Sequence, residues 1–152
     1  MVRARVNAVP GGHEGARLAA DSLAPAFHAL ALGLVLLPGS RVLGVRAAVA
    51  GMVAGVVAGA AREAIGRPRP GVRAEGGFPS RHAASAAAIA LVVTRERPVL
   101  GTVAQILAIT GLAARVASAD HEPLDVVAGV GLGAAVARIM RRRRARRPRR
   151  HP

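Results

Sequence analysis

The chain has 152 residues, 52% of them hydrophobic, and it carries a formal net charge of +14. A soluble domain rarely combines a mean hydropathy of +0.36 with so much charge. The length suits one domain, and the absence of cysteine excludes disulfides and thiolate metal sites. Arginines lie mainly at the C-terminal end and in short stretches between long runs of Ala, Val, Leu and Gly. This layout is typical of membrane spans joined by polar loops.

The apolar runs predict an all-α fold, a polytopic transmembrane helical bundle of about five spans. We expect spans at about 22–37, 42–61, 82–94, 98–114 and 123–140. The third is short for a full crossing, so part of 79–82 is expected to belong to it. Residues 1–21 are predicted to be a polar lead-in, without the pattern of a cleaved signal peptide. Residues 22–140 would form the transmembrane domain, and 141–152 a basic tail.

Two sets of glycines bear on how these helices pack. Gly51, Gly55 and Gly59 recur every fourth residue and would line one helix face that a neighbouring backbone can approach closely. A flexible strand is the alternative for this segment. The stretch from Gly129 to Gly133 superficially resembles a nucleotide-binding loop, but no strand precedes it, so we interpret it as helix packing.

Five spans place the two termini on opposite sides of the membrane. Positive charge stays cytoplasmic, and the tail is the strongest such signal. His121 and the 62–81 loop are then expected outside, although this loop is rich in arginine. A binding site for an anion would explain why those arginines are retained there. The chain has no Trp or Tyr, so the usual aromatic belts are missing.

One candidate pair for chemistry is His121 and Asp125, four residues apart with Pro123 between them. Proline suits the first turn of a helix, so we expect the two side chains to share a face. A carboxylate bonded to one imidazole nitrogen fixes the tautomer and directs the other nitrogen outward as a nucleophile. The alternative is a helix-capping acid beside a surface histidine.

The other candidates are residues that can hold phosphate. Ser80 is placed to cap the helix that follows, and the free N–H groups of a helix start bind phosphate oxygens. His82 would stand at the same place as a general acid, the alternative being an interfacial histidine. Arg67 and Arg69 each precede a proline and would form a stiff fork for phosphate, or a solvated basic loop. Arg115 lies six residues before His121 and is otherwise an interfacial anchor.

The order of these pieces resembles the type 2 phosphatidic acid phosphatase superfamily, over roughly residues 42–140. That family has Lys, six residues, then Arg-Pro; Pro-Ser-Gly-His; and Ser-Arg, five residues, His, three residues, Asp. The corresponding segments here are Arg62 to Arg69-Pro70, Pro79 to His82, and Ala114-Arg115 to His121 and Asp125. The spacings within the first and third motifs fit without gaps.

The resemblance implies a metal-independent lipid phosphatase without a cofactor, whose phosphohistidine forms on His121. Asp125 would orient His121, and His82 would protonate the leaving oxygen. The phosphate oxygens would be bound by Arg62, Arg69, Ser80, Arg81 and Arg115. Three departures from the family pattern stand out: Arg62 replaces Lys, Arg81 replaces Gly, and Ala114 replaces Ser. Arg81 would either add a phosphate donor or crowd the loop. The family's membrane members usually have six spans, and the missing one would be the first.

Two other functions compete with this one. A catalytically inactive membrane protein would use its polybasic tail to bind anionic lipid or nucleic acid. A soluble nucleic-acid-binding protein leaves the apolar runs unexplained and lacks aromatic groups for base stacking. We expect a lipid phosphate substrate on a prenyl or glycerolipid, acidic lipids at the tail, and no nucleic acid. The predicted location is the cell membrane, with the site outside and the C-terminus cytoplasmic.

Overall fold

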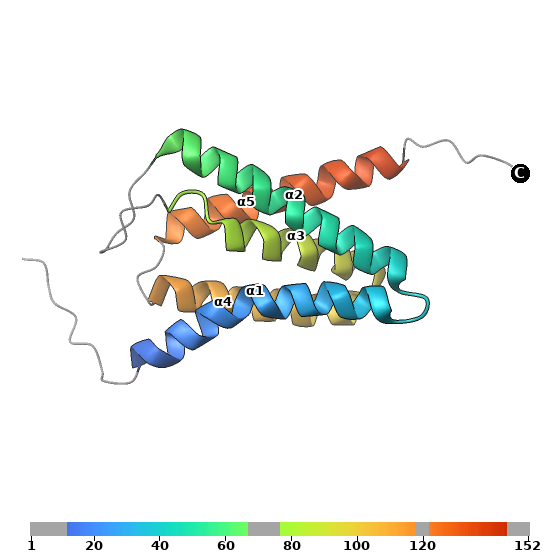
Figure 1. Cartoon of the computed structure of the whole chain (residues 1–152), viewed down its shortest axis with the longest axis horizontal. Helices are drawn as coiled ribbons and strands as arrows, with labels where there is room; N and C mark the ends of the chain where they lie inside the picture. The colour runs from blue at the N-terminus through green and yellow to red at the C-terminus, as the bar shows by residue number, and fades with distance from the viewer. Residues whose placement is uncertain (1–11, 67–76, 118–121, 146–152) are drawn as a thin grey trace, which may run out of the picture.

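The computed structural model describes residues 12–66, 77–117 and 122–145, which form five helices and, within these ranges, no strand (Figure 1). The helices are α1 (Gly12–Leu36), α2 (Arg41–Ile65), α3 (Arg81–Glu96), α4 (Pro98–Ala117) and α5 (Pro123–Ala145). Successive helices run in opposite directions, so α1 starts and α5 finishes at opposite ends of the bundle. The predicted all-α bundle is therefore confirmed.

Helix boundaries differ from the predicted spans mainly at the N-terminus. The 1–21 segment was expected to be a polar lead-in, but α1 already begins at Gly12. Residues 12–21 include Ala, Leu, Glu and Arg, which favour helix even where the sequence is too polar to enter a bilayer. Hydropathy reports the apolar part alone, and that part of α1 runs from Asp21 to Leu36.

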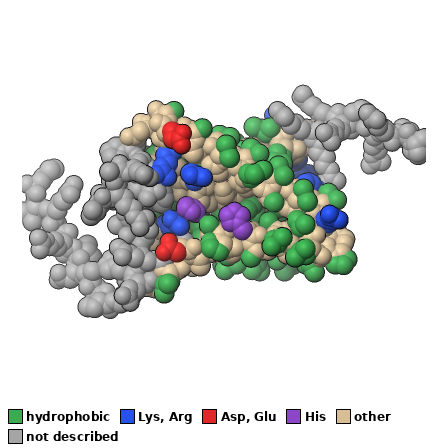
Figure 2. Space-filling view, viewed as in Figure 1, with side chains coloured by type: hydrophobic (Ala, Val, Ile, Leu, Met, Phe, Trp, Pro, Cys, Tyr) green, Lys and Arg blue, Asp and Glu red, His purple; other side chains and the backbone are tan. Residues whose placement is uncertain are grey.

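Three of the described helices are long and apolar enough to cross a membrane: Arg41–Ile65, Pro98–Ala117 and Pro123–Arg142. The apolar stretch of α1 is shorter, and α3 has 16 residues, the fewest of the five. The outer surface of the bundle is apolar, with Val56, Val99 and Val127 each more than 60% exposed. Figure 2 shows such side chains across the middle of the molecule and arginines towards its two ends. This is the surface of a membrane protein.

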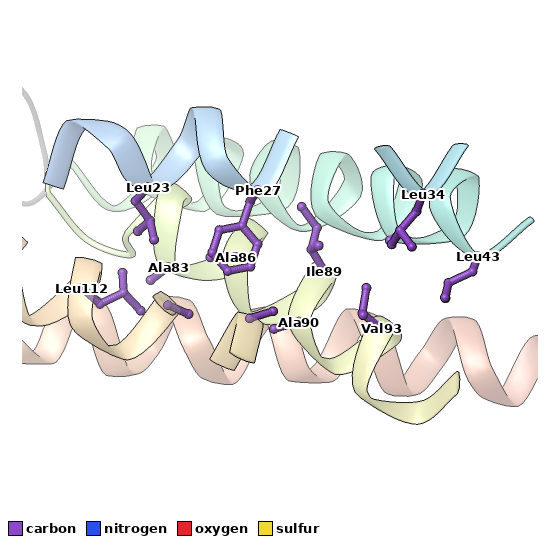
Figure 3. Packing of buried hydrophobic residues seen from close by; sticks show 13 residues of the cluster. Leu23, Phe27, Leu34, Leu43, Ala83, Ala86, Ile89, Ala90, Val93 and Leu112 are labelled. Carbon is purple, nitrogen blue, oxygen red and sulfur yellow. The ribbon is translucent and has the colours of Figure 1, made fainter. Parts of the chain in front are cut away.

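Helix α3 lies at the centre and packs against each of the other four helices. Its buried side chains are mostly alanines, and three of them, Ala83, Ala84 and Ala88, have no exposed surface. Such small side chains let the surrounding helix backbones come close. Larger residues from α1, α2, α3 and α4 fill the remaining space around it, as Figure 3 shows for Leu23, Phe27, Leu34, Leu43, Ile89, Val93 and Leu112.

The glycines of α2 line one face of the helix, as predicted, and that face meets α3. A Cβ atom on Gly51 would lie 2.6 Å from Ile89 Cδ1, and one on Gly55 would lie 2.7 Å from Ser85 Oγ. Neither position has room for a methyl group without movement of its neighbour. Ser85 Oγ also donates a hydrogen bond of 2.8 Å to the Gly51 carbonyl, which fixes the two helices at this level.

Two glycines of α5 bring that helix equally close to α3. A Cβ on Gly129 would lie 2.4 Å from the Ser80 carbonyl oxygen, and one on Gly133 would lie 2.3 Å from that of Ala84. Gly131, between them, meets nothing within 4 Å. The segment is thus helical and packed against α3, and the interpretation as helix packing rather than a nucleotide loop is confirmed.

Polar contacts join the helices at the end of the bundle where α3 finishes and α4 begins. Arg46 of α2 forms an ion pair with Glu96 at the end of α3. Arg97, which follows Glu96, donates a hydrogen bond of 3.4 Å to the hydroxyl of Ser40. These contacts tie the 37–40 connection to the turn between α3 and α4.

Candidate active site

The start of α3 is built around Ser80, which the sequence predicted to be its cap. Ser80 has an extended backbone (φ −70°, ψ 115°), and its hydroxyl accepts a hydrogen bond of 3.4 Å from the Ala83 N–H. Ser80 is fully buried in the described structure. The predicted helix cap is confirmed.

The next two residues of α3 are more accessible than the cap. Arg81 is exposed and His82 is half-buried in the first helical turn. A half-buried histidine at a helix start can be both hydrogen-bonded and reached by a ligand, as a general acid requires.

The start of α5 carries Asp125, which is only 2% exposed. The helix begins at Pro123, as expected for a proline in a first turn. Asp125 Oδ2 accepts a hydrogen bond of 3.0 Å from the Glu122 N–H, which is the geometry of a capping box. The capping role that the sequence left as an alternative is therefore present. His121 lies outside the described residues, so its pairing with Asp125 stays a prediction.

A backbone hydrogen bond joins the two helix starts directly. The Ser80 N–H donates to the carbonyl oxygen of Asp125 at 2.9 Å. The second and third motifs are thus held together by their own backbones, 45 residues apart in the sequence. Sequence reasoning missed this contact, because a backbone-to-backbone bond leaves no signature in residue types. The nearby glycine at 129 is the signal that a close approach was required here.

Two other helices finish at this end of the bundle, and each has an arginine in its last turn. Arg115, in the last turn of α4, is 8% exposed, and Arg62, in the last turn of α2, is half-buried. An arginine is almost never buried unless it is paired, so an interfacial anchor does not describe Arg115. Gly66 closes α2 with a left-handed backbone and donates its N–H to the Arg62 carbonyl at 3.0 Å. Arg67 and Arg69 lie outside the described residues.

Four helix ends therefore meet at one end of the molecule: the ends of α2 and α4, and the starts of α3 and α5 (Figure 1). Arginine, histidine and acidic side chains gather there in Figure 2. Helix starts carry unpaired N–H groups and a partial positive charge, and the arginines add full charges. Such an arrangement is suited to binding a phosphate group.

Comparison with known proteins identifies the family and the fold of this chain. The family model of the PAP2 superfamily matches residues 42–149, which is more than half of the chain. No curated protein matches the chain. Among solved structures, the fold is similar to the crystal structure of a transmembrane PAP2-type phosphatidylglycerolphosphate phosphatase from Bacillus subtilis, with a TM-score of 0.70 and 18% sequence identity. The match covers 96% of this chain and 83% of that one. The family model, together with this shared transmembrane fold, shows that the chain belongs to the PAP2 superfamily.

Proposed function

We propose that this membrane protein hydrolyses a phosphate monoester or pyrophosphate of a prenyl or glycerolipid through a phosphohistidine intermediate. The observation that carries the proposal is the 2.9 Å hydrogen bond between Ser80 and Asp125. It holds the phosphate-binding motif against the nucleophile-bearing motif at the end of the bundle where the arginines gather. Family membership and the phosphatase fold of the structural neighbour support the same reaction class.

His121 would carry out the first step. Its imidazole nitrogen attacks phosphorus and forms a P–N bond while the P–O bond to the lipid breaks. His82 gives its proton to the leaving oxygen, which would otherwise depart as a strongly basic alkoxide from a monoester or as a phosphate anion from a pyrophosphate. In the second step water attacks phosphorus, the P–N bond breaks, and His82 takes up the proton of the water. Asp125 would keep the His121 ring in the reactive tautomer and orientation.

The charge on the phosphoryl oxygens would be stabilised by groups from the ends of α2 and α4 and the start of α3, together with Arg69. These groups are the guanidinium groups of Arg62, Arg69 and Arg115, the hydroxyl of Ser80 and the backbone N–H of Arg81. Donors fixed by helix termini need little rearrangement in the transition state, which is where electrostatic stabilisation accelerates the reaction. The metal-independent mechanism relies on these groups alone, and Ala114 contributes none of the hydroxyl that the family places there.

The apolar surface of the bundle supports a location in the cell membrane. Exposed valines and leucines on the lipid-facing helices would seat the protein in the cell membrane, with the substrate chain remaining in the bilayer. The end that carries Ser80 would face outward, and the arginine-rich end of α5 would face the cytoplasm. There Arg141 and Arg142, both exposed, would attract acidic lipids. No nucleic acid partner is expected.

Purified protein in detergent, assayed for phosphate release on a panel of prenyl and glycerolipid phosphates, tests the proposal. We expect His121→Ala to abolish turnover while the protein still folds. His28→Ala is the matched control, because His28 is an exposed histidine in the middle of the apolar part of α1. An inactive wild-type protein across the whole panel would instead favour the alternative of a non-catalytic membrane protein with a lipid-binding tail.

A further inference from the structure

Arg81 is a departure from the family pattern, which has glycine at this place. It is exposed in the first turn of α3. The charge is therefore accessible to a ligand, next to the cap that begins the candidate phosphate site.

The side chain of Arg81 lies against Gly59 of α2, at the distance of an ordinary van der Waals contact for a Cβ at that position. A Cβ on Gly59 would lie 3.4 Å from Arg81 Nε, 3.6 Å from its Cδ and 3.7 Å from its Cζ, and these are the three nearest atoms. Gly51 and Gly55, on the same face of α2, instead meet Ile89 and Ser85 of α3 at 2.6–2.7 Å. The Arg81 side chain thus lies against the last glycine of the series, whereas the first two glycines let α2 and α3 pack closely. We call this place on Gly59 the seat of Arg81.

This seat places Arg81 beside another arginine of the site. Gly59 and Arg62 are three residues apart on α2, so they share a face and are separated by about 4.5 Å along the axis. The guanidinium of Arg81 therefore lies about one helical turn from the position of Arg62. Guanidiniums that extend from such neighbouring positions can each bind one of two neighbouring phosphates, because each presents a planar fork of donors.

We propose that Arg81 is a specificity-determining residue that binds a second phosphate in the lipid head group, next to the phosphate that is removed. The inference rests on the proposed function and narrows its substrate to head groups with two phosphates. The second phosphate is either the inner group of a diphosphate or a phosphodiester in the same head group. Gly59 is the positioning residue that directs Arg81 toward it.

Matched substrate pairs separate these sources. The first pair is a prenyl monophosphate and the prenyl diphosphate of the same chain; the second is phosphatidate and phosphatidylglycerol phosphate. We expect Arg81→Gly, which restores the family residue, to lower kcat/KM on two-phosphate lipids about tenfold to a hundredfold more than on their one-phosphate partners, as for loss of a hydrogen bond between charged groups. Arg81→Lys should recover part of this loss. Equal losses within both pairs would overturn the proposal.

Gly59→Val gives a second variant, which keeps the arginine but fills the place where its side chain lies. A Cβ there already lies 3.4 Å from Arg81 Nε, so the two γ-methyl groups beyond it would displace the guanidinium, and we expect the same selective loss as in Arg81→Gly. Gly131→Val is the control, because nothing lies within 4 Å of a Cβ there. Unchanged selectivity in a folded Gly59→Val protein would show that the seat does not position Arg81.

A binding measurement keeps this inference separate from the proposed catalysis. By calorimetry, inorganic pyrophosphate should bind the wild-type protein more tightly than phosphate, and Arg81→Gly should abolish most of the difference. Binding with this preference in a protein that hydrolyses no lipid phosphate would refute the proposed function and retain the role of Arg81. Equal affinities for the two anions in the wild-type protein would refute the role of Arg81 itself.

Discussion

Replacing Gly129 by alanine should push apart the two helix starts that form the candidate site. The added Cβ would lie 2.4 Å from the Ser80 carbonyl oxygen, which is 1.0 Å less than an ordinary contact of 3.4 Å. The Ser80 backbone cannot turn away, because its N–H is bonded to Asp125 and its carbonyl oxygen accepts from Ala84. The α3 and α5 starts must then separate by about 1 Å, a displacement that can cost about 100-fold in rate. Overpacking of this kind costs about 1–3 kcal/mol of stability.

The assay is phosphate release per mole of folded protein, measured together with thermal unfolding in the same detergent. Gly131→Ala provides the control, because a Cβ at that position meets nothing within 4 Å. That control should keep the wild-type rate and gain roughly 0.5–1 kcal/mol, since alanine favours helix over glycine. A Gly129→Ala protein with wild-type rate and stability would refute the claim that this contact sets the geometry of the site.

Three further predictions concern mechanism and orientation. His82→Ala should slow release from a lipid alkyl phosphate more than from an activated aryl phosphate, because a general acid matters most for a basic leaving oxygen; equal losses would reduce His82 to a binding role. Activity should survive excess chelator and be inhibited by vanadate, which mimics five-coordinate phosphorus on His121; dependence on an added divalent ion would contradict this. Truncation after Met140 should loosen orientation but not chemistry, because translocating each tail charge costs about 2.3 kcal/mol per 100 mV. With an impermeant reagent on intact cells, labelling of a cysteine in the tail but not in the 71–77 loop would overturn the orientation.

The sequence predicted those parts of the fold that follow from residue type and spacing. Apolar runs located the helices, Ser80 marked the start of α3, and Pro123 marked the start of α5. The four-residue spacing of the α2 glycines identified the face that meets α3. Each of these features is local, and each has a physical cause that acts within a few residues.

Features that depend on two distant segments were not predictable in the same way. Arg115 was open to interpretation as an interfacial anchor, and only its burial by neighbouring helices removes that alternative. The substitution of arginine for glycine at position 81 left two outcomes open, and its contact with Gly59, 22 residues earlier, could not be foreseen from residue types. The early start of α1 was missed because helix propensity extends beyond the apolar stretch that hydropathy detects.

The length of the central helix has a consequence for the depth of the candidate site in the bilayer. At about 1.5 Å per residue, the 16 residues of α3 span about 24 Å, whereas the hydrocarbon core of a typical bilayer is about 30 Å thick. Because α3 is enclosed by the other four helices, the lipid meets longer helices such as α2 and α4, and the bilayer need not become thinner. The start of α3 then lies up to about 6 Å inside the level of the lipid head groups. In vesicles, shortening the acyl chains of the host lipid should therefore bring head groups closer to the level of Ser80 and raise turnover. Bilayer thickness would then regulate the turnover of this enzyme, whatever the chemistry of the substrate's head group.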